Sequence, residues 1–288
     1  MRLTLLGTGT PVPDPLRRGP SQVVEAGASL LLIDCGRGSV DRLMEAGYVL
    51  PGGRALRLPV ATIALTHLHS DHITGLPDLL WAGWVMRWWQ RPPTLVGPPG
   101  TAAMLRHLMD AYAYDIAVRE RGEASHREEL VPPVVEVEEG WASEGDGWRL
   151  GSFRVDHAPV DEAFGFRVDA DAGSVVISGD TCYSENLIRH AQGANLLVHE
   201  VYSRQGMAQR HAATLPDARQ QRLGQTIASY HTPSDQVGKV AAQAGAKHLV
   251  LSHIVWGMGG GVDDITADAS RDFRGRLTLG ADLQAFEV

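Results

Sequence analysis

Three histidines and one aspartate fall within six consecutive positions of this chain, inside the stretch THLHSDHITG at residues 66–75. These four side chains are His67, His69, Asp71 and His72. Neutral imidazoles combined with carboxylate oxygens favour zinc, and manganese or iron can also occupy such a set. Four ligands to one metal from so short a stretch would be crowded. Because two metals could share the stretch more easily, the pattern predicts a binuclear site.

A second metal needs ligands from elsewhere in the chain. His157 in RVDHAP, Asp180 in ISGDT and His253 in LVLSHI each lie at or just beyond an apolar run that reads as a strand. A lone histidine at a strand end is usually structural. Seven residues of metal-binding type at such positions favour a shared site on loops at one edge of a rigid scaffold.

Together, THLHSDHITG, His157, SGDT and LVLSHI resemble the metallo-β-lactamase superfamily over essentially the whole chain. The resemblance implies a metal-dependent hydrolase with one metal on His67, His69 and His157, a second metal on Asp71, His72 and His253, and Asp180 as the bridge. Two cations roughly 3.5–4 Å apart would lower the pKa of a water from about 15.7 towards 7. The resulting hydroxide could attack an ester, amide, lactone, phosphodiester or sulfate, with Asp71 contributing to catalysis.

Two further motifs narrow the branch. The opening LLGTGTPVPDPLRRGPS is similar to that of ribonuclease Z and its arylsulfatase relatives. LLVHEVYS and SYHTPSDQVGKVA place Glu200 and His231 where they resemble the proton-donating pair of ribonuclease Z-like hydrolases. Glu200 would orient His231 and raise its pKa, so that the imidazolium can protonate a departing oxygen. The alternative is that His231 caps a helix starting near Thr232.

One departure bears on the substrate. Ribonuclease Z carries a long tRNA-gripping arm between the positions of His157 and Asp180, whereas 23 positions separate them here, enough only for a hairpin. The net charge of −8 also argues against broad nucleic-acid binding, although 24 of the 26 basic residues are arginine. The chain is therefore expected to cleave a small phosphodiester, sulfate or carboxylic ester. A lactonase or β-lactamase-type hydrolase and a ribonuclease Z-like endonuclease remain the alternatives.

The elements that would position these residues follow from the apolar pattern. Strands come first, mixed elements follow, and helices alternate with strands towards the end. Two sheets packed face to face with helices outside would bury the apolar strands on both sides. The expected fold is of the α/β (α+β) class, a four-layer αββα sandwich. Because no linker divides the 288 residues, one domain over 1–288 is expected. Ser39 is the expected N-cap of an early helix.

The helix expected after the metal motif carries Trp81, Trp84, Trp88 and Trp89. These tryptophans could form buried core, a dimer contact or an aromatic wall of the substrate pocket.

The two cysteines indicate a reducing compartment without a structural disulfide. No signal peptide and no long apolar run is present, so a cytoplasmic protein without a membrane span is expected. The resemblance further implies a homodimer.

Overall fold

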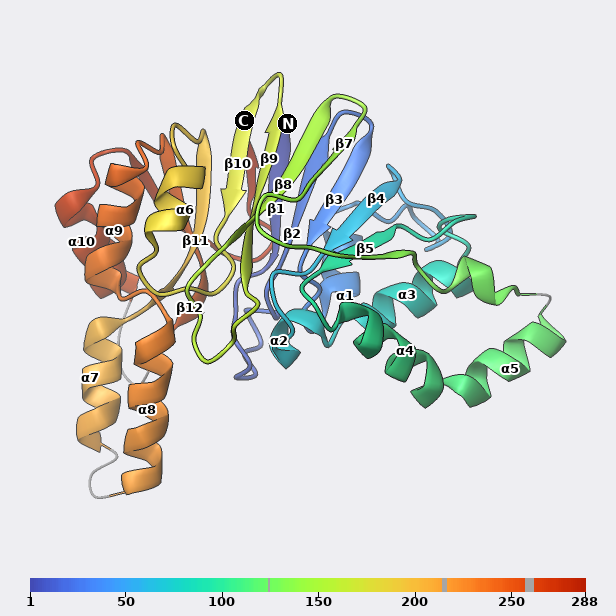
Figure 1. The fold of residues 1–288 in the computed structure, drawn as a ribbon, viewed down its shortest axis with the longest axis horizontal. Helices are drawn as coiled ribbons and strands as arrows, with labels where there is room; N and C mark the ends of the chain where they lie inside the picture. The colour runs from blue at the N-terminus through green and yellow to red at the C-terminus, as the bar shows by residue number, and fades with distance from the viewer. Residues whose placement is uncertain (124, 214–216, 257–261) are drawn as a thin grey trace.

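The computed structural model describes residues 1–123, 125–213, 217–256 and 262–288, and these residues form two seven-stranded sheets packed face to face. Helices lie on the outer face of each sheet, with the two sheets between them (Figure 1). This is the predicted four-layer αββα sandwich. Among the described residues, no helix combines the length and the apolar character that crossing a membrane requires.

The first sheet holds the metal motif at the end of one of its central strands. Its order is β14-β1-β2-β3-β4-β5-β6. The strands are β1 (Arg2–Gly7), β2 (Ser21–Ala26), β3 (Ser29–Ile33), β4 (Val60–Ala64), β5 (Thr94–Gly97), β6 (Val134–Glu136) and β14 (Ala285–Glu287). β2 and β3 form an antiparallel hairpin with Gly27 in its turn, and β3 to β6 run parallel. Parallel strands place their carboxyl ends at one edge of the sheet.

The second sheet supplies the remaining site residues. Its order is β13-β12-β11-β10-β9-β8-β7. The strands are β7 (Ala142–Gly145), β8 (Trp148–Arg154), β9 (Phe164–Ala170), β10 (Gly173–Ile177), β11 (Leu196–Tyr202), β12 (His248–Val255) and β13 (Arg276–Leu279). β7 to β10 are antiparallel, and β10 to β13 are parallel. β9 and β10 are the hairpin expected between His157 and Asp180.

Three apolar layers hold the sandwich together. Between the sheets lie fully buried side chains such as Leu5, Leu31, Phe166 and Val250. Burying one such side chain contributes about 1.5–3 kcal/mol. Further clusters join each sheet to its outer helices. The core therefore fixes both sheets, and with them the edge at which the site residues gather.

The helices, together with one 3-10 turn at Arg127–Glu129, occupy the connections between strands. They are α1 (Ser39–Glu45), α2 (Ser70–Ile73), α3 (Leu76–Val85), α4 (Thr101–Ala111), α5 (Ala113–Gly122), α6 (Glu185–His190), α7 (Arg204–Ala213), α8 (Ala218–Tyr230), α9 (Ser234–Gln243) and α10 (Val262–Asp272). α1 begins one residue earlier than expected, because Gly38 and not Ser39 is its N-cap. The Ser39 hydroxyl donates to the carbonyl of Gly36 instead.

The tryptophan-rich segment is only partly helical. α3 ends at Val85, so Trp88 and Trp89 lie beyond it and do not share its face. All four indole N–H groups donate hydrogen bonds, from Trp81 to Asp115, from Trp84 to the His126 carbonyl, from Trp88 to the Gly53 carbonyl and from Trp89 to the Glu129 carbonyl. The four rings belong to the apolar layer outside the first sheet. This packing favours the core alternative over a wall of the substrate pocket.

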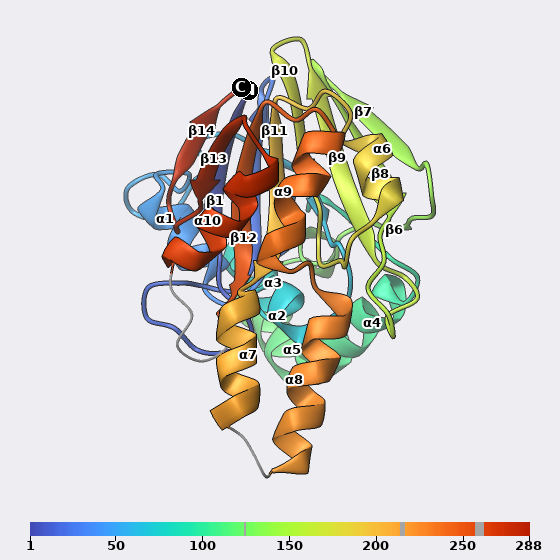
Figure 2. The same ribbon diagram turned by 90° about the vertical axis from the view of Figure 1, so that its left-hand side faces the viewer.

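α7 and α8 form a helical hairpin that projects away from the sandwich (Figures 1 and 2). The residue that follows α8 is His231, so the hairpin is attached beside the expected site.

Both cysteines are free, Cys35 being buried and Cys182 partly exposed. The absence of a disulfide agrees with the expectation from the sequence.

Candidate metal centre

Two site histidines and a short helix lie directly after β4. The strand ends at Ala64, and the chain then carries His67 and His69 in a segment that has no regular structure. His69 is extended, with φ −63° and ψ 146°, and serves as the N-cap of α2. Asp71 and His72 lie in α2, which turns their side chains towards the same point from another direction. One six-residue stretch therefore faces the site from two sides.

The second sheet brings the other three residues to the same edge. His157 follows β8, and Asp180 follows β10. His253 lies inside β12 at a bulge, where the pairing with β11 shifts between Glu200 and Val201. Its φ of 43° is in the left-handed region, which is uncommon for a side chain other than glycine. A bulge of this kind re-aims one side chain, here towards the sheet edge.

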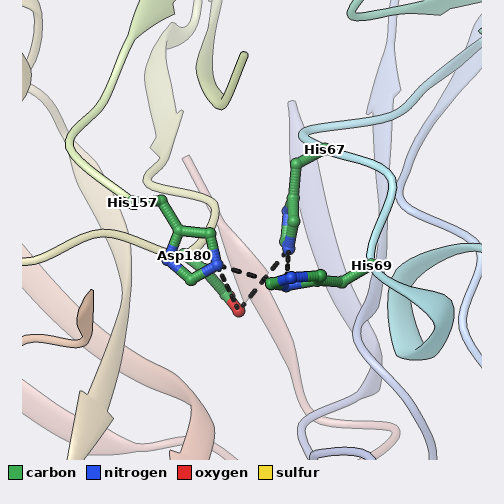
Figure 3. Close-up of side chains that lie close together, drawn as sticks. All are labelled: His67, His69, His157 and Asp180. Carbon is green, nitrogen blue, oxygen red and sulfur yellow. Dashed lines mark hydrogen bonds and ion pairs between the residues drawn. The ribbon is translucent and has the colours of Figure 1, made fainter. Parts of the chain in front are cut away.

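The first group of ligand atoms consists of three imidazole nitrogens and one carboxylate oxygen (Figure 3). His67 Nε2 lies 3.0 Å from His69 Nδ1, and His157 Nε2 lies 3.2 Å from the same His69 atom. Asp180 Oδ2 is 3.8 Å from His67 Nε2 and 4.0 Å from His157 Nε2. The four side chains come from both sheets and point at one another.

The second group shares Asp180 with the first. His253 Nε2 lies 3.2 Å from Asp71 Oδ2 and 3.4 Å from Asp180 Oδ2. His72 Nε2 lies 3.7 Å from Asp71 Oδ2 and 3.3 Å from Asp180 Oδ2. Asp180 Oδ2 is therefore placed between the two groups, as a bridging carboxylate would be. We call these seven residues the seven-residue cluster.

Neighbouring groups fix which nitrogen of each histidine faces the cluster. His72 Nδ1 lies 2.8 Å from Asp34 Oδ2, so in the neutral ring Nδ1 carries the proton and Nε2 is left as the ligand atom. The Thr66 hydroxyl donates to Asp34 and lies 3.0 Å from His67 Nδ1. His157 Nδ1 lies 3.0 Å from the carbonyl oxygen of Tyr230. The three Nε2 atoms thus present lone pairs to the centre of the cluster.

This arrangement fits cations better than it fits hydrogen bonding. His69 Nδ1 can carry at most one proton, yet it faces the acceptor atoms of both His67 and His157. His72 Nε2 and Asp180 Oδ1 are buried without a hydrogen-bond partner among the described residues. Unsatisfied buried acceptors are costly. A divalent cation at each group would satisfy them, and the donor set of imidazole and carboxylate suits such ions.

The protonation of the cluster follows from burial and from mutual charge. Burial lowers the pKa of His67 well below its ordinary value, and the neighbouring His72 lowers it further. Burial has the same effect on His72, but Asp180 and Asp34 outweigh it and raise its pKa well above normal. For Asp180, burial favours the neutral form, but His253 and His72 outweigh it and hold the pKa well below normal. The Asp180 carboxylate is therefore ionised.

Glu200 and His231 lie side by side at the edge of the cluster, as the sequence predicts. His231 Nδ1 is 3.2 Å from Glu200 Oε2, and both residues are buried. Glu200 Oε1 accepts a hydrogen bond of 2.7 Å from the backbone N–H of Thr232, which holds the carboxylate in place. Burial lowers the pKa of His231, but Glu200 outweighs it and raises the pKa to about 9. α9 begins at Ser234 with Pro233 as N-cap, so His231 does not cap it.

Two cavities adjoin the cluster. A polar cavity of about 200 Å³ lies over it and is lined by Pro11, His69, Ser70, Asp71, Asp180, Tyr230, His231 and His253. A mainly apolar cavity of about 400 Å³ is lined by Thr10, Pro11, Val12, Arg210, Leu223, Ile227, Tyr230, His231, His253, Val255 and Trp256. Both share His231 and His253. A substrate could therefore place its reacting group at the cluster and its apolar part beside α8.

Some contacts of the site were not expected from the sequence. Tyr230 lines both cavities and orients His157 through its backbone carbonyl, a role that its place in SYHTPSDQVGKVA does not reveal. Arg17, Arg18 and Ser21 of the opening LLGTGTPVPDPLRRGPS motif form their side-chain hydrogen bonds outside the cluster. Arg17 donates to the Thr8 hydroxyl, and Ser21 donates to the Asp34 carbonyl. Two further histidines, His199 and His248, are packed within β11 and β12.

The fold and the cluster together define a class of protein, the metal-dependent hydrolases with a metallo-β-lactamase fold. Residues 30–254 match the family described as the β-lactamase superfamily domain. The chain is 40% identical to ribonuclease Z of Mycobacterium avium, over 100% of this chain and 98% of that protein. The chain belongs to the metallo-β-lactamase superfamily, in the branch that contains ribonuclease Z.

Solved structures support the same fold. The metallo-β-lactamase fold protein YhfI from Bacillus subtilis superposes with a TM-score of 0.70 at 18% identity, covering 100% of this chain and 99% of that one. The short form of human tRNase Z superposes with a TM-score of 0.69 at 22% identity, over the same shares of the two chains. At these identities the likeness is one of fold.

Proposed function

We propose that this protein is a ribonuclease that uses two divalent metal ions to hydrolyse phosphodiester bonds of RNA. The observation that carries the proposal is the complete seven-residue cluster in a chain 40% identical, over its whole length, to a protein named ribonuclease Z. A phosphodiester is among the substrates that the sequence already favours. The relatives favour an RNA diester over the small phosphodiester, sulfate or carboxylic ester first expected.

The short connection between His157 and Asp180 does not weigh against RNA. The alignment with the Mycobacterium avium protein spans 294 positions against the 288 residues of this chain. That relative therefore has room for only a few additional residues and carries no long insertion either. The lack of an arm at this place is compatible with the name ribonuclease Z, and the argument against an RNA substrate loses its main support.

The residues have distinct proposed roles. The seven residues would hold the ions, with Asp180 shared between the two groups, and zinc is favoured by the number of imidazoles. When bound, the ions supply Lewis acidity and ionise water near neutral pH. Asp34 holds the His72 ring in the orientation that exposes Nε2. Asp71 lines the polar cavity and would contribute to catalysis through the ion that it helps to hold.

The Glu200–His231 pair is the proposed proton donor. Because Nδ1 of His231 faces Glu200, Nε2 is the nitrogen left to hold the proton that is transferred. His231 lines both cavities, so this proton would be given to the ribose oxygen that departs when the diester is cleaved. Glu200 does not touch the substrate in this scheme. It orients the ring and stabilises its positive charge.

The test uses the metal-replete protein and a transfer-RNA transcript with a 3′ extension. Cleavage at a defined position, abolished by a chelator and restored by zinc or manganese, is the expected result. An aryl phosphodiester, an aryl sulfate and a lactone are assayed in parallel. An intact transcript together with rapid opening of the lactone, or rapid hydrolysis of the sulfate, would overturn the proposal in favour of the corresponding hydrolase.

We further propose that the protein is a cytoplasmic homodimer of one-domain chains. Its mass in solution tests the dimer, and fractionation of cells tests the location.

A further inference from the structure

α7 and α8 form a hairpin that stands outside the two packed sheets (Figures 1 and 2). α8 has no buried residue and packs chiefly against α7 (Figure 2). An amphipathic helix normally buries one face against the core. A 13-residue helix that is kept without such burial, at the rim of the site, indicates a surface that serves binding.

The hairpin is basic, although the chain is acidic. Residues 204–230 contain four arginines and one acidic residue, Asp217, in a chain of net charge −8. Asp217 is the N-cap of α8 and accepts hydrogen bonds from the backbone N–H groups of Arg219 and Gln220. Arg219 and Arg222 are exposed, and neither forms an ion pair within the described part of the chain. Both guanidinium groups are therefore available to an anionic partner.

The arginines lie on the side of α8 that leads to the cluster. Arg219, Thr226 and Tyr230 recur at spacings of seven and four residues, which places them on one helical face, with Arg222 beside it. Leu223 on the same side lines the apolar cavity, and Tyr230 lines both cavities. At a rise of about 1.5 Å per residue, Arg219 lies roughly 16 Å along the axis from Tyr230.

We infer that this face of α8 binds the phosphate backbone of the RNA substrate and guides it to the cluster at Tyr230. The inference rests on the proposed ribonuclease function and gives it a binding surface at a place other than the connection between His157 and Asp180. Arginine suits this role because its planar guanidinium can donate two hydrogen bonds to one phosphate. Two exposed arginines on a helix, without a pocket around them, contact backbone and do not read base sequence.

α8 is also connected to the chemistry. The carbonyl oxygen of its last residue, Tyr230, accepts the hydrogen bond from His157 Nδ1. Arg219 and Arg222, by contrast, lie eleven and eight residues before this contact. Arg219 and Arg222 can therefore be changed without altering the cluster, which makes a clean separation of RNA binding from catalysis possible.

The test compares two double variants with equal changes of net charge. Arg219→Glu with Arg222→Glu alters the proposed surface. Arg106→Glu with Arg121→Glu alters exposed arginines of α4 and α5 as the matched control. We measure kcat/KM for the extended transfer-RNA transcript at several salt concentrations, and kcat/KM for an aryl phosphodiester. Arg219→Gln with Arg222→Gln, which adds no repulsion, is the milder variant.

The expected result is selective for RNA. The Arg219→Glu, Arg222→Glu variant lowers kcat/KM for the transcript at least tenfold. It also reduces the slope of log kcat/KM against log salt by roughly 1.5, about 0.7–0.9 for each lost phosphate contact. Hydrolysis of the aryl phosphodiester stays within about twofold, and the control pair behaves like the wild type. An equal loss of kcat/KM for the transcript in the two double variants, or no loss in Arg219→Glu, Arg222→Glu, would overturn the inference.

Two further outcomes keep this inference distinct from the proposed function. If the wild type does not cleave the transcript, the proposed function fails, and fluorescence anisotropy of labelled RNA then decides on the surface alone. Unchanged RNA affinity in the Arg219→Glu, Arg222→Glu variant would overturn the inference in that case as well. Binding of polyglutamate as tightly as RNA, with the same salt slope, would overturn it in favour of an acidic protein partner.

Discussion

The Glu200–His231 pair gives the sharpest prediction, because its effect depends on the leaving group. An RNA diester expels a ribose alkoxide, which needs a proton, whereas a nitrophenyl diester expels a phenolate that leaves without one. Replacing His231 by Ala should therefore lower kcat/KM for RNA by about 10²–10⁴, the usual contribution of a general acid. This loss corresponds to about 3–5 kcal/mol of transition-state stabilisation. For the nitrophenyl diester the loss should stay below about tenfold.

The structure determines the controls for this experiment. His231 lies close enough to Asp180 and His253 for these three residues to form a possible metal-binding group of their own. Metal content is therefore measured in each variant, and the account predicts no change. His231→Asn keeps a polar group near the Nδ1 position without a proton donor at Nε2, so it should lose as much activity as the Ala variant. Glu200→Gln keeps an acceptor for the Thr232 N–H and should lose about tenfold.

The reasoning is refuted if the two substrates lose activity to the same extent. It is also refuted if His231→Ala loses one metal ion per chain, because His231 would then be a ligand and not a proton donor. Thermal unfolding of each variant is recorded first. Removing His231 leaves the buried carboxylate of Glu200 without its cationic neighbour, so some loss of stability is expected in any case.

Three further predictions concern the groups around the cluster and one distant histidine. Asp34→Asn removes the carboxylate that orients His72 and should weaken metal binding 10- to 100-fold in a chelator competition, whereas unchanged affinity would show that Asp34 is not needed. Gly36→Ala should reduce metal content and the unfolding temperature, because the added Cβ would lie 2.5 Å from the carbonyl oxygen of Asp71. A variant with full metal content and an unchanged unfolding temperature would contradict this prediction. Burial and the charge of Arg276 lower the pKa of His248 to about 4. Protonation of His248 therefore favours the unfolded state. The contribution of the neutral His248 to the free energy of unfolding is complete above about pH 6.5 and is lost as the pH falls towards 4. In urea titrations, the free energy of unfolding should decrease between pH 7 and 4.5 by about 1–2 kcal/mol less in His248→Gln than in the wild type. An identical decrease in both proteins would show that His248 does not cause this pH dependence.

The sequence contained most of the information about the sandwich and the gathering of the seven residues. His67, His69, Asp71 and His72 follow a buried strand within one short stretch, and such density has few structural explanations. Asp180 follows another apolar strand, and strand ends at one edge bring distant residues together. These signals are local, so they can be read without coordinates.

Other features depend on tertiary structure and could not be read in advance. The bulge that turns His253 towards the edge is a mismatch of register between β11 and β12, which no single segment encodes. Tyr230 contributes through a backbone carbonyl, which every residue type has. α3 ends at Val85, so Trp88 lies outside the helix, and its indole bonds to Gly53, a residue distant in sequence.

The α7–α8 hairpin was also missed, for a physical reason. Helices are predicted from the periodic apolar face that they bury, and α8 buries none. The basic character of residues 204–230 is likewise hidden by the acidic total. As a result, the sequence pointed to a small ester, and the four arginines between residues 204 and 230 did not enter that prediction.

The central claim is that the seven-residue cluster holds two divalent ions. Elemental analysis of the purified protein, after metal removal and resupply with zinc or manganese, tests it most directly. The account predicts about two ions per chain in the wild type, and a clear loss in Asp180→Ala, because that carboxylate is shared by both groups. Fewer than one ion per chain after resupply, or an unchanged content in Asp180→Ala, would contradict it.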